Sequence, residues 1–508
     1  MSLISSSFFA LLLITMVFYY SSANLWEGKL QKYILLITSV FFYLKVSTNN
    51  PHKILFMLIY IIAVTYIGGV LIEKYDGWRR TSVFIATIIG LIGILFVTKY
   101  AYNMLSLVGD ILHTASDFSI LKFGSIIGIS YFILSAIGYL ADVYMEIARS
   151  EKNIVIVALF VIFFPQVVSG PITRFKQMSP QFQKKHSLDY DVVTHALRRM
   201  AWGYFKKLVI SERFAIVASA VYADYTSYSG IGIMCATFCY AIQIYTDFSG
   251  CMDIVLGASG LFGIVLPENF RAPYMSLSYQ EFYQRWHMTL GLWFKDYVMY
   301  PLQKSDLLQV IWERCKRIFG KKRGKKVAFY IAMLILWLGI GIWHGGTALY
   351  FMVSTIIPFT SLVLGDMLHP SFLAINEFLH INVNADSWKW FQRLRTLSIT
   401  CILFLFMCAG SISRGIDVMR FSLSHFISYG SLDAALGGMK IGITDAVIMV
   451  IGATILLISD ILIDSRSSIF DVMDRQNLFA REFIVALELT IIAVYGMVGQ
   501  SQFIYFQF

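Results

Sequence analysis

Apolar runs of about 20 residues recur along the whole chain, and they constrain the fold more than any other feature. Apolar residues make up 57% of the 508 positions, and only 14% are charged. A helix needs roughly 20 apolar residues to cross the hydrocarbon core of a bilayer. The sequence therefore predicts an all-α, multi-pass membrane protein with about 11 to 14 membrane-embedded helices. The candidate runs are residues 4–23, 30–47, 54–72, 82–98, 121–140, 153–168, 200–222, 230–247, 327–344, 347–365, 396–412, 442–463 and 483–500.

The residues between these runs give no sign of a second, soluble domain. No period of roughly 20 to 50 residues repeats, and no low-complexity linker or long polar block interrupts the apolar pattern. The longest stretches outside the runs are residues 171–195, 266–302 and 366–395. Their mixture of apolar and charged side chains predicts interfacial or re-entrant helices. We therefore expect a single membrane-embedded domain over residues 1–508.

The charge of the chain is +10, and its largest basic cluster predicts orientation in the membrane. Residues 314–326 read R-C-K-R-I-F-G-K-K-R-G-K-K, without an acidic residue. The positive-inside rule places this loop, and residues 465–482, in the cytoplasm, so the tail 501–508 is expected on the extracytoplasmic side. The cluster could attract anionic lipids or steer a polyanionic cytosolic substrate. Neither use predicts nucleic-acid binding, and the orientation of the amino terminus stays open.

The cysteines do not predict a metal site. They show no C-x-x-C pair and no Cys/His spacing typical of zinc. We expect packed thiols, no bound metal and no resident cofactor. The six are Cys235, Cys239, Cys251, Cys315, Cys401 and Cys408.

Two Trp-His pairs, Trp286-His287 and Trp343-His344, stand out in this apolar chain. An ionisable side chain within a membrane is costly, so each histidine is a candidate functional residue. A neutral imidazole in an apolar tunnel is a competent general base for a hydroxyl. The alternative is structural, with each ring bonded to a backbone carbonyl and a hydroxyl inside the bundle.

Local patterns predict the helices that carry these histidines. Residues 279–302 follow helical spacing and predict one amphipathic helix ended by Pro301. A second helix, over residues 327–344, begins after the basic loop and carries His344 roughly 25 Å from it. The Gly345-Gly346 pair predicts a break directly after this histidine.

Charged residues elsewhere in the apolar regions are expected to pair with one another. Paired charges hold a bundle together, and the loss of one partner leaves the other unpaired in a dry site. We expect this structural role for Arg174, Asp247, Asp253, Arg285 and Asp296.

Five segments together resemble one known family of membrane enzymes. The chain is similar to the membrane-bound O-acyltransferase (MBOAT) family, in particular its bacterial branch of alginate O-acetylation and teichoic acid D-alanylation membrane proteins. The resemblance covers at least residues 160–360. It rests on R-W-H-M-T-L-G-L-W-F-K-D-Y from Arg285, G-I-W-H-G from Gly341, F-P-Q-V-V-S-G-P-I-T-R-F from Phe164, Y-T-D-F-S-G-C-M-D-I from Tyr245 and L-P-E-N-F-R-A-P-Y from Leu266.

The resemblance implies a ring of tilted helices around a central tunnel, with an acyl donor entering from the cytoplasm. His344 matches the family's catalytic histidine and is expected to be the general base. His287 matches its second polar position and is expected to orient or polarise the donor carbonyl. Their neighbours Trp286, Trp343 and Arg285 are expected to bind substrate.

The tail F-I-Y-F-Q-F resembles the terminal aromatic motif of polysaccharide-acylating members of this branch. Its only hydroxyl belongs to Tyr505. The resemblance implies that this phenol, once a base takes its proton, carries the acyl group as a covalent relay. The alternative is that Tyr505 is an interfacial aromatic anchor.

Three classes of function compete: an acyltransferase, a secondary transporter and a scaffold for a cell-envelope synthase. A transporter should show two repeated halves with broken helices, and the sequence shows none. The resemblance favours O-acetylation of an exported polysaccharide from acetyl-CoA, with D-alanyl transfer to teichoic acid from a carrier protein as the alternative. It places the protein in a bacterial cytoplasmic (inner) membrane, among membrane lipids. It also implies a separate extracytoplasmic SGNH-type acyltransferase as the partner that completes the transfer.

Overall fold

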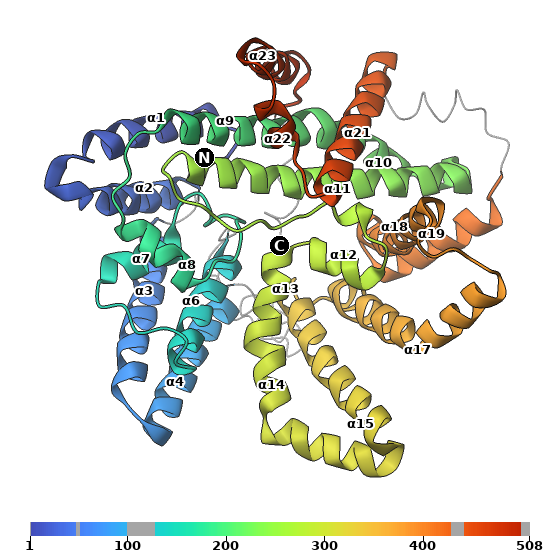
Figure 1. The fold of residues 1–508 in the computed structure, drawn as a ribbon, viewed down its shortest axis with the longest axis horizontal. Coiled ribbons are helices and arrows are strands. Elements are labelled where there is room, and N and C mark those ends of the chain that lie inside the picture. Colours follow the sequence, from blue (N-terminus) through green and yellow to red (C-terminus); the bar gives the residue numbers. More distant parts are fainter. Residues whose placement is uncertain (1, 47–50, 99–127, 428–440, 499–508) are drawn as a thin grey trace, which may run out of the picture. The chain divides into compact units, whose positions relative to one another are not determined.

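The computed structural model describes residues 2–46, 51–98, 128–427 and 441–498 (Figure 1). These residues form α-helices, short 3₁₀ helices and π-helical turns, and no strand occurs among them. The predicted all-α class is thus confirmed. Contacts within the chain define two compact units, Met1–Trp202 with Cys251–Pro267 and Gly203–Gly250 with Glu268–Phe508. The single domain over residues 1–508 stays a prediction.

The first unit has an aromatic core in which the segment after α11 packs on the first helix. The Tyr19 ring lies 5.3 Å from the Phe262 ring, and the Tyr19 hydroxyl donates its proton to the Phe262 backbone carbonyl. The Phe164 ring lies 5.8 Å from the Phe262 ring. The helices are α1 (Ser6–Ser21), η1 (Leu25–Gly28), α2 (Gln31–Val46), α3 (Pro51–Lys74), α4 (Gly77–Phe96), α6 (Ile129–Tyr144), α7 (Ile154–Ile162), α8 (Phe175–Gln183), most of α9 (Tyr190–Tyr204) and the end of α11 (Gly230–Gly260).

The second unit contains both Trp-His pairs and most of α11. Its other elements are η4 (Phe205–Ser211), α10 (Glu212–Ala223), η5 (Tyr225–Ser227), η6 (Pro273–Met275), α12 (Tyr279–Arg285), α13 (Met288–Phe294), η7 (Lys295–Met299), α14 (Tyr300–Lys304), α15 (Asp306–Trp343), α16 (Ala348–Phe351), η8 (Met352–Ile356), α17 (Ile357–Phe378), α18 (Asp386–Ala409), α19 (Ile412–Ser424), α21 (Ile443–Asp464), α22 (Ile469–Asp474) and α23 (Leu478–Tyr495).

Seven helices of the described chain are long and apolar enough to cross a membrane. Together with the apolar composition they make this a multi-pass membrane protein. The larger count of embedded helices and their arrangement as a ring stay predictions. The run at residues 153–168 forms only the nine-residue α7, because Pro165 disfavours helical backbone at the residue before it. The seven segments are Pro51–Lys74, Gly77–Phe96, Gly230–Gly260, Asp306–Trp343, Ala348–Phe378, Asp386–Ala409 and Ile443–Asp464.

A buried ion-pair cluster joins η4 and α10 to α11 in the second unit. The Lys207 ammonium lies 2.5 Å from the Asp247 carboxylate and 2.7 Å from that of Glu212, and all three side chains are at most 3% exposed. Gly250 permits this close packing, since a Cβ there would approach the Gly203 carbonyl oxygen at 2.9 Å. In the first unit Asp253 pairs with Arg199 at 2.5 Å. Both aspartates therefore have the structural pairing predicted for them.

We expect Lys207→Met to lower the free energy of unfolding by about 3–5 kcal/mol, because it leaves two buried carboxylates without their shared cation. Thermal unfolding in detergent measures the change. The control is Lys316→Met, which breaks an exposed pair with Glu313 worth less than about 1 kcal/mol. Equal shifts for the two variants would show that the buried cluster is not a major source of stability.

Candidate active site

A cavity of about 1250 Å³ lies within the second unit and is lined by residues from the middle of the chain. Its walls come from α11, α12, α13, η7, α14, α15, α16, η8, α17 and α18, and its lining includes His287 and His344. Pockets for drug-sized molecules have volumes of roughly 300–1000 Å³. The cavity is thus large enough for a long ligand that reaches both histidines.

One face of α15 forms a wall along the length of this cavity. Lys321, Lys325, Phe329, Met333 and Leu336 lie at helical spacing and line it, and Trp337, Ile340 and His344 continue the same face. At 1.5 Å per residue, Lys321 and His344 are roughly 35 Å apart along the helix. The cavity therefore extends from a basic end to a histidine end.

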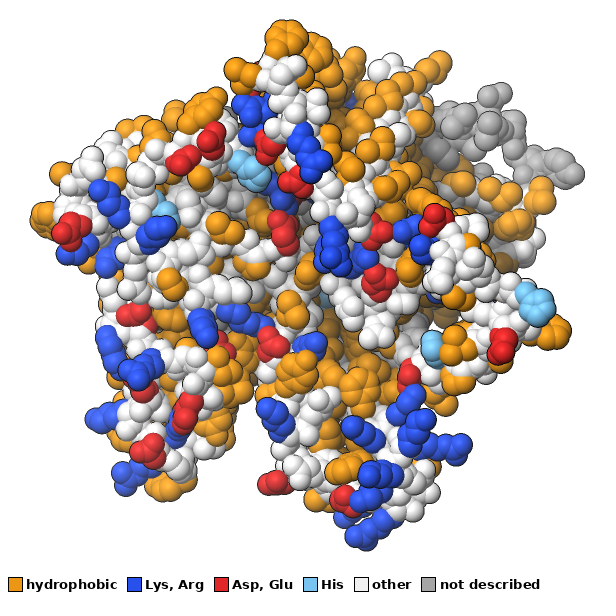
Figure 2. Space-filling model, in the orientation of Figure 1, with side chains coloured by type: hydrophobic (Ala, Val, Ile, Leu, Met, Phe, Trp, Pro, Cys, Tyr) orange, Lys and Arg blue, Asp and Glu red, His pale blue; other side chains and the backbone are white. Residues whose placement is uncertain are grey.

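The basic segment is helical, and the prediction that it forms a loop before a helix over residues 327–344 is wrong. α15 begins at Asp306 and is interrupted only at Gly320, where φ is 77°. Figure 1 shows the resulting bend, and in Figure 2 lysine and arginine side chains gather on this part of α15 at the lower edge. Lysine and arginine are good helix formers, so charge density alone does not indicate a loop.

His287 lies at a break between two helices. α12 ends at Arg285 and α13 begins at Met288, so the predicted single amphipathic helix over residues 279–302 is wrong. The backbone of His287 is left-handed, with φ 47° and ψ 51°, and the residue is 4% exposed. Left-handed backbone in a residue other than glycine is uncommon and often occurs at functional sites.

Pro301 does not end the second of these helices. α13 continues through the π-helical turn η7 into α14, where Pro301 occupies the first turn. Proline has no N–H to donate to the preceding turn, and a π-helical turn directly before it changes the hydrogen-bonding pattern at that point. The helical segment therefore runs on to Lys304, and its residues Tyr300 and Gln303 line the cavity.

Asn269 holds His287 and the start of α13, and it was not among the predicted site residues. Its backbone carbonyl accepts the Met288 N–H at 2.9 Å, and its Oδ1 accepts the Thr289 N–H at 3.1 Å. Oδ1 also accepts the Thr289 hydroxyl proton at 2.9 Å and lies 3.2 Å from His287 Nδ1. Asn269 is 1% exposed. The only signal in the sequence was an amide inside the segment L-P-E-N-F-R-A-P-Y.

The two Trp-His pairs come together around Trp343. Its ring lies 5.9 Å from the His287 ring and 4.8 Å from the His344 ring. His344 also stacks on Tyr350, with the two ring centroids 6.0 Å apart; Tyr350 lines the cavity and was not among the predicted site residues. After His344, Gly345 and Gly346 have φ values of 126° and 66°, which confirms the predicted break.

Trp286 lines the cavity, whereas Trp343 is not among the lining residues. Trp286 is 9% exposed and belongs to an aromatic cluster drawn from α11, η6, α12 and α18. This packing holds Trp286, the residue before His287, in place, because a bulky ring held by several neighbours resists rotation. The cluster contains Tyr245, Phe270, Tyr274, Phe282 and Phe404, with ring centroids 5.1–6.4 Å from that of Trp286.

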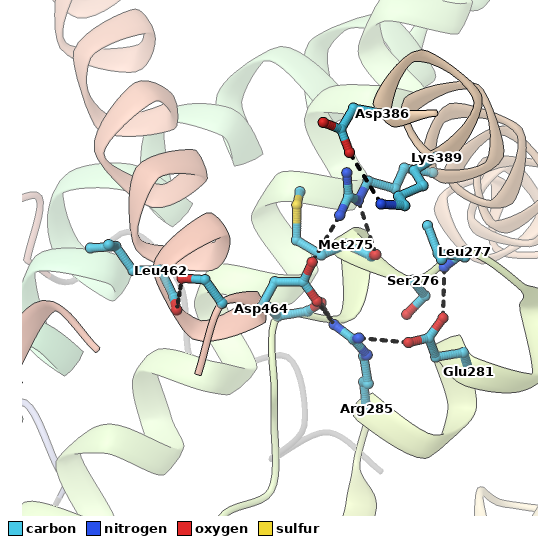
Figure 3. Close-up of polar contacts among 12 residues, drawn as sticks. Met275, Ser276, Leu277, Glu281, Arg285, Asp386, Lys389, Leu462 and Asp464 are labelled. Atoms are coloured by element: carbon cyan, nitrogen blue, oxygen red, sulfur yellow. Dashed lines mark hydrogen bonds and ion pairs between the residues drawn. The ribbon is translucent and has the colours of Figure 1, made fainter. Parts of the chain in front are cut away.

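Arg285 lies in an ion-pair network outside the cavity lining (Figure 3). Its guanidinium contacts the Glu281 carboxylate at 2.5 Å and the Asp464 carboxylate at 2.8 Å. Arg393 shares Asp464 at 2.8 Å. These contacts join α12 to α18 and α21, as expected of a structural pair, whereas substrate binding by Arg285 stays a prediction.

Tyr505 falls outside the described residues. Among the described residues, no group of three or more His, Cys, Asp or Glu side chains is placed to hold a metal ion.

Comparison with known proteins settles the family. A model of the membrane-bound O-acyltransferase (MBOAT) family matches residues 143–409, a range that contains both Trp-His pairs and the cavity lining. The chain belongs to the MBOAT family. The resemblance found in the sequence motifs is thereby confirmed.

Three relatives of this chain are named for acyl transfer to alginate, peptidoglycan or teichoic acid. It is 30% identical to the probable alginate O-acetylase AlgI of Pseudomonas syringae, over 55% of this chain and 48% of that protein. It is 33% identical to the peptidoglycan O-acetyltransferase of Helicobacter pylori, over 43% of each. It is 23% identical to the teichoic acid D-alanyltransferase of Bacillus subtilis, over 56% of this chain and 67% of that protein. The chain thus spans about half the length of the first two relatives.

Proposed function

We propose that this MBOAT protein is an O-acyltransferase that moves an acetyl group from cytosolic acetyl-CoA across the membrane for O-acetylation of an exported polysaccharide. The observation that carries the proposal is the cavity, which joins Lys321 and Lys325 at one end to His287 and His344 at the other. The names of the O-acetylating relatives support the choice of reaction.

The cavity suits a long donor with an anionic end. Lysine side chains attract phosphate groups, so Lys321 and Lys325 would hold the nucleotide of the donor. The apolar face of α15 between them and His344 would accommodate the pantetheine arm, with the thioester next to the histidines. The proposed direction of entry follows from the positive-inside rule, which puts the basic end in the cytoplasm.

The proposed chemistry needs one base and one acceptor hydroxyl. His344 takes the hydroxyl proton while the hydroxyl oxygen attacks the thioester carbonyl carbon. The carbon–sulfur bond then breaks, and the protonated imidazole returns the proton to the departing CoA sulfur. The products are an ester and free CoA thiol, and His344 regains its starting state.

Tyr505 is the proposed first acceptor, which would pass the acetyl group to a separate extracytoplasmic SGNH-type acyltransferase. This role rests on the resemblance of the terminal motif. The test uses membranes of a bacterial host, with the protein in the cytoplasmic (inner) membrane and radiolabelled acetyl-CoA as donor. Peptide mapping should find label on Tyr505 that is absent in Tyr505→Phe and retained in the control Tyr495→Phe. Transfer that continues at full rate in Tyr505→Phe would rule out the relay.

D-alanyl transfer to teichoic acid is the second candidate, and the match to the Bacillus subtilis relative favours it. The two candidates differ in their donor, since the alternative uses a D-alanyl carrier protein. Parallel incubations with labelled acetyl-CoA and with a labelled D-alanyl carrier protein separate them. Label from the carrier protein and none from acetyl-CoA would replace the proposed function with this one.

The basic end of the cavity gives a prediction for donor affinity. We expect the double variant Lys321→Gln and Lys325→Gln to raise the KM for acetyl-CoA roughly tenfold with little change in kcat, because each exposed lysine–phosphate contact is worth up to about 1 kcal/mol. Higher salt should reduce the difference. The control variant, Lys322→Gln with Arg323→Gln, removes the same charge from side chains outside the cavity lining. Equal effects of both double variants would mean that only net charge matters.

A further inference from the structure

The contact between Asn269 and His287 determines which ring nitrogen of the histidine carries its proton. Asn269 Oδ1 accepts the backbone N–H of Thr289 at 3.1 Å. A backbone N–H can only donate, so this contact identifies the oxygen of the amide and excludes the flipped side chain. His287 Nδ1 faces the same oxygen at 3.2 Å. A carbonyl oxygen has no proton to give, so Nδ1 must be the donor.

The ring of His287 is neutral in this environment. Burial holds the pKa of its imidazole well below the ordinary value of 6.5, and the neighbouring His344 lowers the pKa further. A neutral imidazole carries a single N–H. With that proton on Nδ1, the other ring nitrogen, Nε2, has a lone pair and can only accept a hydrogen bond.

We propose that Asn269 is a positioning residue that fixes His287 in its Nδ1–H tautomer, so that His287 presents a hydrogen-bond acceptor to an O–H or N–H group of the bound substrate. This inference rests on the proposed function, in which His287 lines the reacting end of the cavity. Of the two roles expected for His287, to orient or to polarise the donor carbonyl, it assigns the orienting one. Donation from Nε2 to the donor carbonyl would need a second proton on the ring.

The position of Asn269 in the chain makes it suited to this role. Its backbone carbonyl and its Oδ1 accept the first two N–H groups of α13, Met288 and Thr289, so the amide is held against the start of the helix. A second backbone hydrogen bond, from the Arg271 N–H to the Arg285 carbonyl at 3.0 Å, joins the segment that contains Asn269 to the end of α12. The left-handed backbone of His287 lies between these ties. The histidine therefore has little freedom to rotate away from the amide.

The test measures the protonation of the ring nitrogens directly. The full-length protein, labelled with ¹⁵N-histidine and placed in lipid bilayers, is examined by solid-state NMR, and the His287 signals are assigned by their loss in His287→Asn. We expect a protonated Nδ1 and an unprotonated Nε2. A wild-type spectrum with the proton on Nε2 would overturn the proposal whatever the activity.

Three variants connect the tautomer to the reaction. Asn269→Ala should populate the Nε2–H form and slow acyl transfer by about 10- to 100-fold, the usual cost of losing an orienting partner. Asn269→Asp keeps an acceptor oxygen and should keep the Nδ1–H signature and recover most of the lost rate. Thr289→Val removes the 2.9 Å hydroxyl contact to the same oxygen and leaves Asn269 in place, so it is a matched control for local packing and should leave the tautomer unchanged.

The outcomes separate this inference from the function on which it rests. If no donor supports acyl transfer, the proposed function fails while the NMR signals still decide the tautomer. If transfer occurs and Thr289→Val slows it as much as Asn269→Ala, with the Nδ1–H signature intact in both, then Asn269 is structural and the inference is wrong. If Asn269→Ala does not fold, the wild-type spectrum and the Asn269→Asp and Thr289→Val variants still carry the test.

Discussion

Replacement of His344 by alanine is expected to lower the rate of acyl transfer by about 10²- to 10⁴-fold, the range for loss of a positioned general base. The KM for the donor should change little, because the imidazole takes part in proton transfer, whereas the donor is bound at the basic end of the cavity. Transfer of labelled acetyl groups from acetyl-CoA, measured in purified membranes at equal protein levels, gives both constants.

The matched control for this variant is His369→Ala, which removes an exposed histidine from α17. This change should leave the rate within about twofold, as surface substitutions away from special features are small. A His344→Ala protein that folds and transfers acetyl groups at the control rate would remove His344 from the mechanism. The base would then have to be sought among the other cavity residues.

His287→Phe is expected to slow transfer by at least about 100-fold, in line with loss of a well-placed polar group at a reacting centre. Phenylalanine keeps a planar ring but offers no acceptor to the substrate. It also tolerates the left-handed backbone of this position less well than histidine, which is enriched in that conformation. The rate and the unfolding temperature should therefore both fall.

His287→Asn separates the two effects. Asparagine tolerates left-handed backbone better than other residues with a side chain of this size, so the unfolding temperature should stay close to that of the wild type. Its amide oxygen can accept a hydrogen bond, so part of the rate should remain. A full rate in His287→Phe would contradict any role for this histidine in the reaction.

Local signals in the sequence predicted some features of the site well. The apolar runs indicated the all-α membrane class, because a helix that crosses a bilayer needs a continuous run of apolar residues. The Gly345-Gly346 pair predicted the turn after His344, and both residues have positive φ values. The Trp-His pairs marked residues that the structure brings together around Trp343.

Features that depend on distant contacts could not be predicted in this way. Helical spacing continues across Trp286 and His287, so periodicity alone joined α12 to α13. The break is held by Asn269, which is 18 residues before His287 in the sequence. The helical form of the basic segment was also missed, since the positive-inside rule reports the side of the membrane and not the conformation of the backbone. The role of Tyr505 stays a prediction.

α15 also restricts how proteins of this kind can change in evolution. Lys321 and Lys325 lie in the uninterrupted part of α15 after Gly320, and His344 directly follows its last residue. The number of residues between them therefore sets both their separation and the direction in which they face. One inserted residue would rotate His344 by about 100° away from the other two and move it by about 1.5 Å. An insertion of seven residues, close to two full turns, would turn His344 back to the face of the two lysines and increase its distance from them by about 10 Å. A relative that uses a longer donor arm is therefore expected to differ in this helix by about two whole turns.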